Sequence, residues 1–145
     1  MAKQLFYEDV EVGTEVTPLV KHPTPRQLVK WAGGSADFAE IHYNNDIAVA
    51  RQLPGIVIHG KLKFAWLGQL MTDWIGEKGV LRKLTCEYRQ TDVPGDTITC
   101  AGEVTNKYVK DGEHCVECRI WVENGKGETT TPGTAIVVLP SRGKR

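Results

Sequence analysis

The sequence predicts an α+β protein in which an antiparallel sheet wraps around one central helix. Two observations support this prediction. The only long helix-like segment, from Lys61 to Trp74, lies in the first half of the 145-residue chain, is rich in apolar residues and contains no proline. The second half contains four strand-like runs separated by turn sequences. Helices that precede a series of neighbouring strands are typical of α+β folds rather than of alternating parallel folds.

The segment from Lys61 to Trp74 is predicted to be the central helix because its apolar side chains point in most directions. Leu62, Trp66 and Leu70 trace one stripe at helical spacing. The apolar residues outside that stripe are Phe64, Leu67, Met71 and Trp74. We therefore expect this helix to be surrounded by protein on most sides.

Caps and helix breakers define two earlier helices. Thr24 can cap a helix that begins at Pro25, continues to Ala32 and stops at Gly33-Gly34. An asparagine cap, at position 44 or 45, predicts a short helix over residues 46–52.

Less regular structure is expected around these helices. A turn at residues 11–14 should lead into a strand over 15–20. Residues 37–42 are expected to be irregular or to form a single helical turn, and 56–58 a short strand.

The four strands of the second half are predicted from apolar and β-branched runs. They are Leu81–Thr91, Thr97–Val109, His114–Glu123 and Thr130–Leu139. Asp111-Gly112 and Asn124-Gly125 separate the last three runs and predict two antiparallel hairpins. Pro94-Gly95-Asp96 predicts a further turn.

Composition narrows the class of protein. Lysine plus arginine and aspartate plus glutamate both number 18, so nucleic-acid binding has no support from net charge. No apolar run is long enough to span a membrane, and no signal-peptide pattern occurs near the N-terminus, which predicts a cytoplasmic protein. Residues 1–145 are expected to form one domain, with a disordered basic tail at 141–145.

Four cysteines offer a possible metal or redox motif. Cys115 and Cys118 have CxxC spacing, but their neighbours indicate a strand, in which these two positions face opposite sides. No second CxxC completes a zinc ligand set. We therefore expect packed, reduced thiols and no metal.

Asp37 and His42 form the first candidate for chemistry. On an irregular loop the two side chains could converge on one water, with histidine accepting a proton and aspartate orienting the water. From the residues alone, the structural alternative is favoured: Asp37 forms a turn and His42 is a buried, hydrogen-bonded histidine. Four other carboxylates are expected in turns or solvated positions, namely Asp73, Asp92, Asp96 and Asp111.

Gly60 is the second candidate, because it stands where the 56–58 strand should end and the central helix begin. Its N–H would be an unpaired donor at the positive end of the helix dipole, able to bind a carbonyl oxygen that gains charge. Alternatively, the glycine serves only a tight turn. His59, beside it, is expected to be structural rather than catalytic.

These residues carry a resemblance to a known family. Ser35-x-Asp37-x-x-x-x-His42, followed by Ile58-His59-Gly60, resembles the MaoC-like (R)-specific enoyl-CoA hydratases. Val93-Pro94-Gly95-Asp96-Thr97 resembles the strand-turn-strand segment of that family. The resemblance covers roughly residues 5–139 and implies a hotdog fold, in which the sheet wraps a central helix.

The resemblance also implies a reaction, the reversible hydration of a trans-2-enoyl-CoA to an (R)-3-hydroxyacyl-CoA. Asp37 and His42 would activate the water, and the Gly60 N–H would bind the thioester oxygen. No metal or redox cofactor is implied, since CoA is part of the substrate.

The sequence departs from the family pattern at two places. The usual asparagine and proline of the catalytic loop are replaced by Ala39 and Glu40. Ala65 and Gly68 stand where relatives often carry a hydroxyl side chain, which predicts a roomy pocket for a medium-to-bulky acyl chain. Ile58 and His59 are expected to contribute to the wall of that pocket.

The run Asp37-Phe38-x-x-x-His42, with Thr72-Asp73-Trp74 after the helix, resembles small MaoC-like subunits more closely. Some of those subunits act on bulky CoA thioesters and pair with a second MaoC-like chain. We therefore expect either a homodimer or a heteromer in which this chain contributes the Asp/His site. An acyl-CoA thioesterase on the same fold and a non-catalytic partner subunit are the alternatives.

Overall fold

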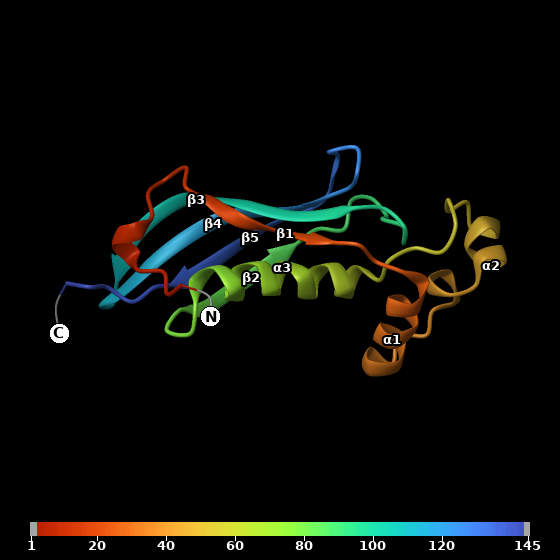
Figure 1. Cartoon of the computed structure of the whole chain (residues 1–145), viewed down its shortest axis with the longest axis horizontal. Coiled ribbons are helices and arrows are strands. Elements are labelled where there is room, and N and C mark those ends of the chain that lie inside the picture. The colour runs from red at the N-terminus through yellow and green to blue at the C-terminus, as the bar shows by residue number, and fades with distance from the viewer. Residues whose placement is uncertain (1–2, 144–145) are drawn as a thin grey trace.

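The computed structural model describes residues 3–143, which form a curved five-stranded sheet with one long helix along its inner face (Figure 1). The helical elements are η1 (Tyr7–Asp9), α1 (Pro25–Ser35), η2 (Glu40–His42), α2 (Asn45–Ala50) and α3 (Gly60–Ile75). The strands are β1 (Glu15–Lys21), β2 (Val80–Cys86), β3 (Ile98–Lys110), β4 (Glu113–Glu123) and β5 (Thr129–Val138). This architecture confirms the predicted α+β class.

The strands follow the order β1-β3-β4-β5-β2, and every neighbouring pair is antiparallel. Asp111 and Gly112 form the β3–β4 turn with φ of 52° and 77°, as a two-residue hairpin turn requires. At the β4–β5 turn, the Asn124 side chain accepts bonds from the N–H groups of Lys126 and Glu128, each at 3.0 Å. Both predicted hairpins are thus confirmed.

The strand predicted over 81–91 is shorter than expected. β2 ends at Cys86, after which the chain keeps only irregular backbone bonds to β5, such as that from the Arg89 N–H to the Thr130 carbonyl at 3.1 Å. β2 also pairs with β5 rather than with β3, so the second half of the chain is not a simple meander.

One side of α3 packs against the sheet, where it buries Leu62, Trp66, Leu67 and Leu70. From the strands, the core adds inward-facing side chains at alternate positions. These include Val16, Ile98, Cys100, Val104, Val116, Cys118, Ile120, Val122, Ala135 and Val137.

The opposite side of α3 is open in the single chain. Its exposed residues are Lys61, Ala65, Gln69, Thr72 and Asp73. The prediction that protein surrounds this helix on most sides is therefore wrong for the isolated protomer.

α1 and α2 lie beyond the end of the sheet; α1 is near the first turn of α3, and α2 lies farther out (Figure 1). α1 does not stop at Gly33-Gly34 but continues to Ser35, whose hydroxyl donates to the Trp31 carbonyl at 2.7 Å. The left-handed conformation of Ala36, with φ of 60°, then ends the helix. The predicted strand at 56–58 is absent; the Ile58 N–H bonds instead to a loop carbonyl, that of Asp92, at 2.8 Å.

The end of the chain is partly held in place. Ser141 bonds to Glu8, and the Arg142 guanidinium pairs with the Asp9 carboxylate at 2.7 Å, so these two residues are not a frayed tail. Residues 144–145 of the predicted tail lie outside the described residues. Within residues 3–143, no helix combines the length and the apolar character needed to cross a membrane.

Candidate active site

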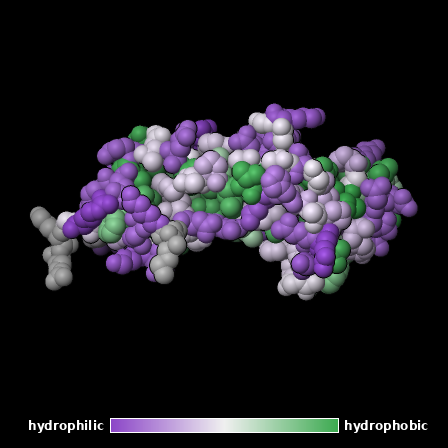
Figure 2. All heavy atoms as spheres, in the orientation of Figure 1, coloured by the Kyte–Doolittle hydropathy of each residue, from purple (hydrophilic) through white to green (hydrophobic). Residues whose placement is uncertain are grey.

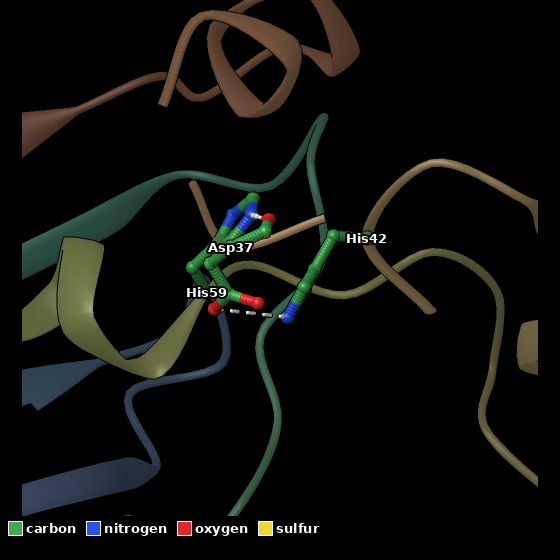
Figure 3. Close-up of side chains that lie close together, drawn as sticks. All are labelled: Asp37, His42 and His59. Carbon is green, nitrogen blue, oxygen red and sulfur yellow. Dashed lines mark hydrogen bonds and ion pairs between the residues drawn. The ribbon is translucent and has the colours of Figure 1, made fainter. Parts of the chain in front are cut away.

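Three side chains converge just before α3: Asp37, His42 and His59 (Figure 3). Asp37 lies in the loop after α1, His42 ends η2, and His59 precedes the first residue of α3. The Asp37 Oδ2 atom lies 3.9 Å from His42 Nε2. The structure therefore brings the predicted Asp/His pair together, with Asp37 in the loop and His42 at the end of the single turn expected within residues 37–42.

The hydrogen bond of His42 defines the tautomer of its neutral ring. Its Nδ1 atom lies 2.7 Å from the Val57 carbonyl oxygen, which can only accept a hydrogen bond. Nδ1 must therefore carry the proton, which leaves Nε2 with a lone pair in the neutral ring. That lone pair faces the Asp37 carboxylate, whose side chain remains 36% exposed while the His42 side chain is 9% exposed. A proton acceptor thus stands next to a carboxylate that solvent reaches.

His59 is completely buried and stacks on His42, with ring centroids 3.8 Å apart and an interplanar angle of 18°. Its Nε2 atom lies 3.2 Å from the Asp37 backbone carbonyl, so Nε2 carries the proton. Burial, and next the neighbouring His42, lower the pKa of His59 below its ordinary value. His59 is therefore a neutral ring that contacts both members of the pair.

Gly60 begins α3, as predicted, and its N–H has no hydrogen-bond partner among the described residues. Its lack of a side chain has a packing reason, because a Cβ atom there would lie 3.1 Å from the Tyr88 ring. The N–H stands at the positive end of a helix of 16 residues. The geometry suits both a close-packing role and an oxyanion donor.

A groove of about 660 Å³ runs beside Gly60 between α3 and β2. It is lined by Trp31, Lys61, Phe64, Ala65, Leu84, Thr85, Cys86 and Tyr88. Of the predicted wall residues, Ala65 lines this groove, and a Cβ atom on Gly68 would lie 3.6 Å from Leu84. Ile58 packs in the core and His59 is fully buried, so neither lines the groove.

Asp37, His42 and His59 together also present potential metal ligands, with atoms within 4.8 Å of one another. Imidazole binds a metal through a lone pair in the ring plane, and two stacked, nearly parallel rings with centroids 3.8 Å apart do not direct their lone pairs to one point. In this arrangement the two rings cannot ligate one ion. The geometry favours acid/base chemistry over metal binding.

A buried ion pair near the site was not predicted. Asp92, expected in a solvated turn, is 3% exposed and lies 3.0 Å from Lys63 Nζ, itself on the first turn of α3. Thr130 donates to the same Asp92 oxygen at 2.6 Å, and Lys63 also donates to the Gln90 carbonyl at 3.0 Å. The sequence contains a signal for the burial of Lys63, because this residue falls on the same helical face as Trp66 and Leu70.

The thiols do not contribute to the candidate site as nucleophiles. Cys118 belongs to the core cluster whereas Cys115, buried on the same strand, does not, in agreement with their predicted opposite faces. Burial raises the pKa of Cys100 and of Cys118 to about 12. Cys86, at the groove, also has a raised pKa because it is partly buried. All four thiols are free.

Comparison with known proteins agrees with this fold. Residues 8–126 match the family described as "MaoC like domain". The chain therefore belongs to the MaoC-like dehydratase family, and the predicted membership is confirmed.

A curated relative is the 3-oxo-4,17-pregnadiene-20-carboxyl-CoA hydratase beta subunit of Mycobacterium tuberculosis. It is 28% identical over 101 residues, which cover 70% of this chain and 77% of that protein.

Two solved structures show the same fold. One is the ChsH1-ChsH2 complex of M. tuberculosis, with a TM-score of 0.77 and 24% identity over 89% of this chain and 98% of that one. The other is the R-hydratase PhaJ1 of Pseudomonas aeruginosa, with a TM-score of 0.85 and 23% identity over 96% of this chain and 88% of that one.

Proposed function

We propose that this protein catalyses the reversible hydration of trans-2-enoyl-CoA thioesters to 3-hydroxyacyl-CoA. The single observation that carries the proposal is the meeting of Asp37 and His42, with a His42 Nε2 lone pair 3.9 Å from the Asp37 carboxylate. A water at about 2.8 Å from each atom fits this separation, with one O–H directed at each acceptor. Membership of a dehydratase family and the fold of R-hydratases support the same reaction class.

In the proposed reaction each of these groups has a role. His42 Nε2 removes a proton from the water as its oxygen bonds to the β-carbon of the enoyl group. The alkene electrons move toward the thioester carbonyl, where the Gly60 N–H stabilises the enolate oxygen. The Asp/His pair then returns a proton to the α-carbon, which completes the addition of water and regenerates the enzyme. Addition on the face that gives the (R)-alcohol is part of the proposal.

We propose that the groove beside Gly60 receives the acyl chain. Its open wall at Ala65 and the missing side chain at Gly68 leave room for medium-to-bulky groups. Each buried methylene contributes about 0.8 kcal/mol, so chains that fill the groove should be the better substrates. The M. tuberculosis relative is named as a hydratase of a pregnadiene carboxyl-CoA, which supports a bulky acyl group.

The test is a matched pair of assays on a series of enoyl-CoA thioesters, starting with crotonyl-CoA. Hydration should remove the enoyl absorbance and leave the thioester intact, with kcat/KM rising from the four-carbon chain to longer or ring-bearing chains. Release of free CoA thiol from the saturated acyl-CoA of the same length would instead identify a thioesterase. No reaction with any chain length, alone or with a partner subunit, would refute the proposal.

We also propose that a second MaoC-like chain covers the open side of α3. Apolar side chains lie exposed between β1 and the middle of α3 (Figure 2), and both β1 and β2 are free sheet edges in the protomer. The curated relative is a beta subunit, and one structure with this fold is a two-protein complex. Sedimentation velocity should show a dimer or a heteromer. A monomer that remains fully active at the lowest measurable concentration would contradict this assembly.

A further inference from the structure

His59 occupies a position that the proposed reaction leaves without a role. It is 0% exposed, yet its ring contacts both members of the Asp/His pair. Nε2 donates to the Asp37 carbonyl at 3.2 Å, and the ring stacks on His42 at 3.8 Å. Within residues 3–143, no other side chain both hydrogen-bonds to Asp37 and stacks on or hydrogen-bonds to His42.

The loop that carries Asp37 has few other anchors. The Asp37 N–H donates to Ser35 Oγ at 3.2 Å, and the Asp37 side chain accepts from the Ala39 N–H at 3.4 Å. Both bonds are solvent-exposed and connect residues only two positions apart. The bond from His59 is different, because it joins this loop to a buried residue 22 positions away. It can therefore fix where the carboxylate stands relative to the rest of the protein.

The backbone of His59 also leads directly to the proposed oxyanion donor, the Gly60 N–H. Its carbonyl accepts the N–H groups of Leu62 at 3.1 Å and Lys63 at 3.2 Å, which begins α3. The N–H of Gly60 follows directly in the chain. One residue thus connects Asp37, His42 and the proposed oxyanion donor.

We propose that His59 is a positioning residue, which holds Asp37 and His42 at the separation that one shared water requires and ties both to the Gly60 N–H. The inference rests on the proposed function of that pair. His59 is not a second base, because its Nδ1 atom is buried without a hydrogen-bond partner among the described residues. Its lowered pKa agrees with a ring that stays neutral beside His42.

Three substitutions separate the contributions of the hydrogen bond and the stacking. His59→Gln places an amide N–H near the position of Nε2 and keeps the donor. His59→Asn has the same chemistry, but its shorter side chain does not reach the Asp37 carbonyl. His59→Phe keeps a stacked ring and removes the donor. All three stay neutral, so none adds a buried charge.

We expect His59→Gln to keep kcat within about threefold of wild type. His59→Asn and His59→Phe should each lower kcat by about 10- to 100-fold, with KM within about twofold, since misplaced reacting groups slow chemistry more than binding. Equal activity of the Gln and Asn variants would overturn the proposal. So would full activity of the Phe variant, or a loss that follows the melting temperature across the three proteins.

A second measurement does not need turnover. A two-bond ¹H–¹⁵N spectrum of the wild-type histidine rings at pH 7 should show the Nε2–H tautomer for His59 and the Nδ1–H tautomer for His42. A His59 ring with its proton on Nδ1 and none on Nε2 would overturn the proposed link to Asp37. If this tautomer is found but no enoyl-CoA is hydrated, the proposed function fails while the contact itself stands.

Discussion

Replacing Asp37 with asparagine, or His42 with alanine, is expected to lower kcat for enoyl-CoA hydration by roughly 10²–10⁴-fold, the usual contribution of a positioned acid or base. Asparagine keeps the size of Asp37 but turns one acceptor into a donor, so the water between the two side chains loses its orientation. Alanine at position 42 removes the Nε2 lone pair. Neither change should lower the melting temperature enough to explain the loss of activity. The Asp37 side chain is 36% exposed, and replacing His42 with alanine places no charge in the protein interior.

Matched controls exist for both changes. Glu40 carries an exposed carboxylate on the same short helix as His42, and His22 is an exposed histidine. Glu40→Gln and His22→Ala should therefore retain nearly full activity. Steady-state kinetics on the best enoyl-CoA substrate, with thermal unfolding of each variant, provide the comparison. An Asp37→Asn or His42→Ala protein with activity near wild type would remove that residue from the mechanism.

Local signals explain which parts of the fold could be predicted. The turn at Asp111 and Gly112 depends on backbone conformations that its own residues favour, and the hairpin formed there. The pairing of β2 with β5 depends on contacts between distant segments, which turn residues do not encode. The end of α1 was misplaced because Gly33 and Gly34 lower helix propensity only modestly, whereas the bond from Ser35 to Trp31 favours another turn.

In the candidate site, too, contacts between residues close in sequence could be predicted and contacts between distant segments could not. Asp37 and His42 stand five positions apart, so a short sequence pattern can identify them. The contact between His59 and Asp37 spans 22 positions, and that between Lys63 and Asp92 spans 29. Both depend on how loops meet at the start of α3. The second contact also required a lysine on the buried face of a helix, where sequence patterns predict an apolar residue.

That buried pair is expected to show the largest effect on stability. The Lys63 and Asp92 side chains are 2% and 1% exposed, and their charged atoms lie 3.0 Å apart. Lys63→Met should lower the free energy of unfolding by about 3–5 kcal/mol, because it leaves a carboxylate buried without its cation. Thr130 would still donate to Asp92 Oδ2, but Oδ1 already has no hydrogen-bond partner among the described residues.

Urea unfolding of single and double variants measures this effect. Asp92→Leu alone should destabilise by a similar amount, since it leaves the ammonium of Lys63 unpaired. The double variant Lys63→Met/Asp92→Leu should recover much of the loss, because replacing both charges with apolar groups removes the uncompensated one. Arg89→Met is the surface control: its pair with Glu87 has side chains 65% and 70% exposed. That change should cost about 1 kcal/mol at most.

The same pair should also influence the site. Lys63 binds the Gln90 carbonyl, and the Asp92 carbonyl accepts the Ile58 N–H, so the pair joins the segment after β2 to the start of α3. Tyr88, in that segment, packs over Gly60. We therefore expect Lys63→Met to raise KM for enoyl-CoA even at temperatures where the protein is fully folded, while Arg89→Met leaves KM unchanged. A Lys63→Met protein with unchanged stability and KM would show that the pair contributes to neither.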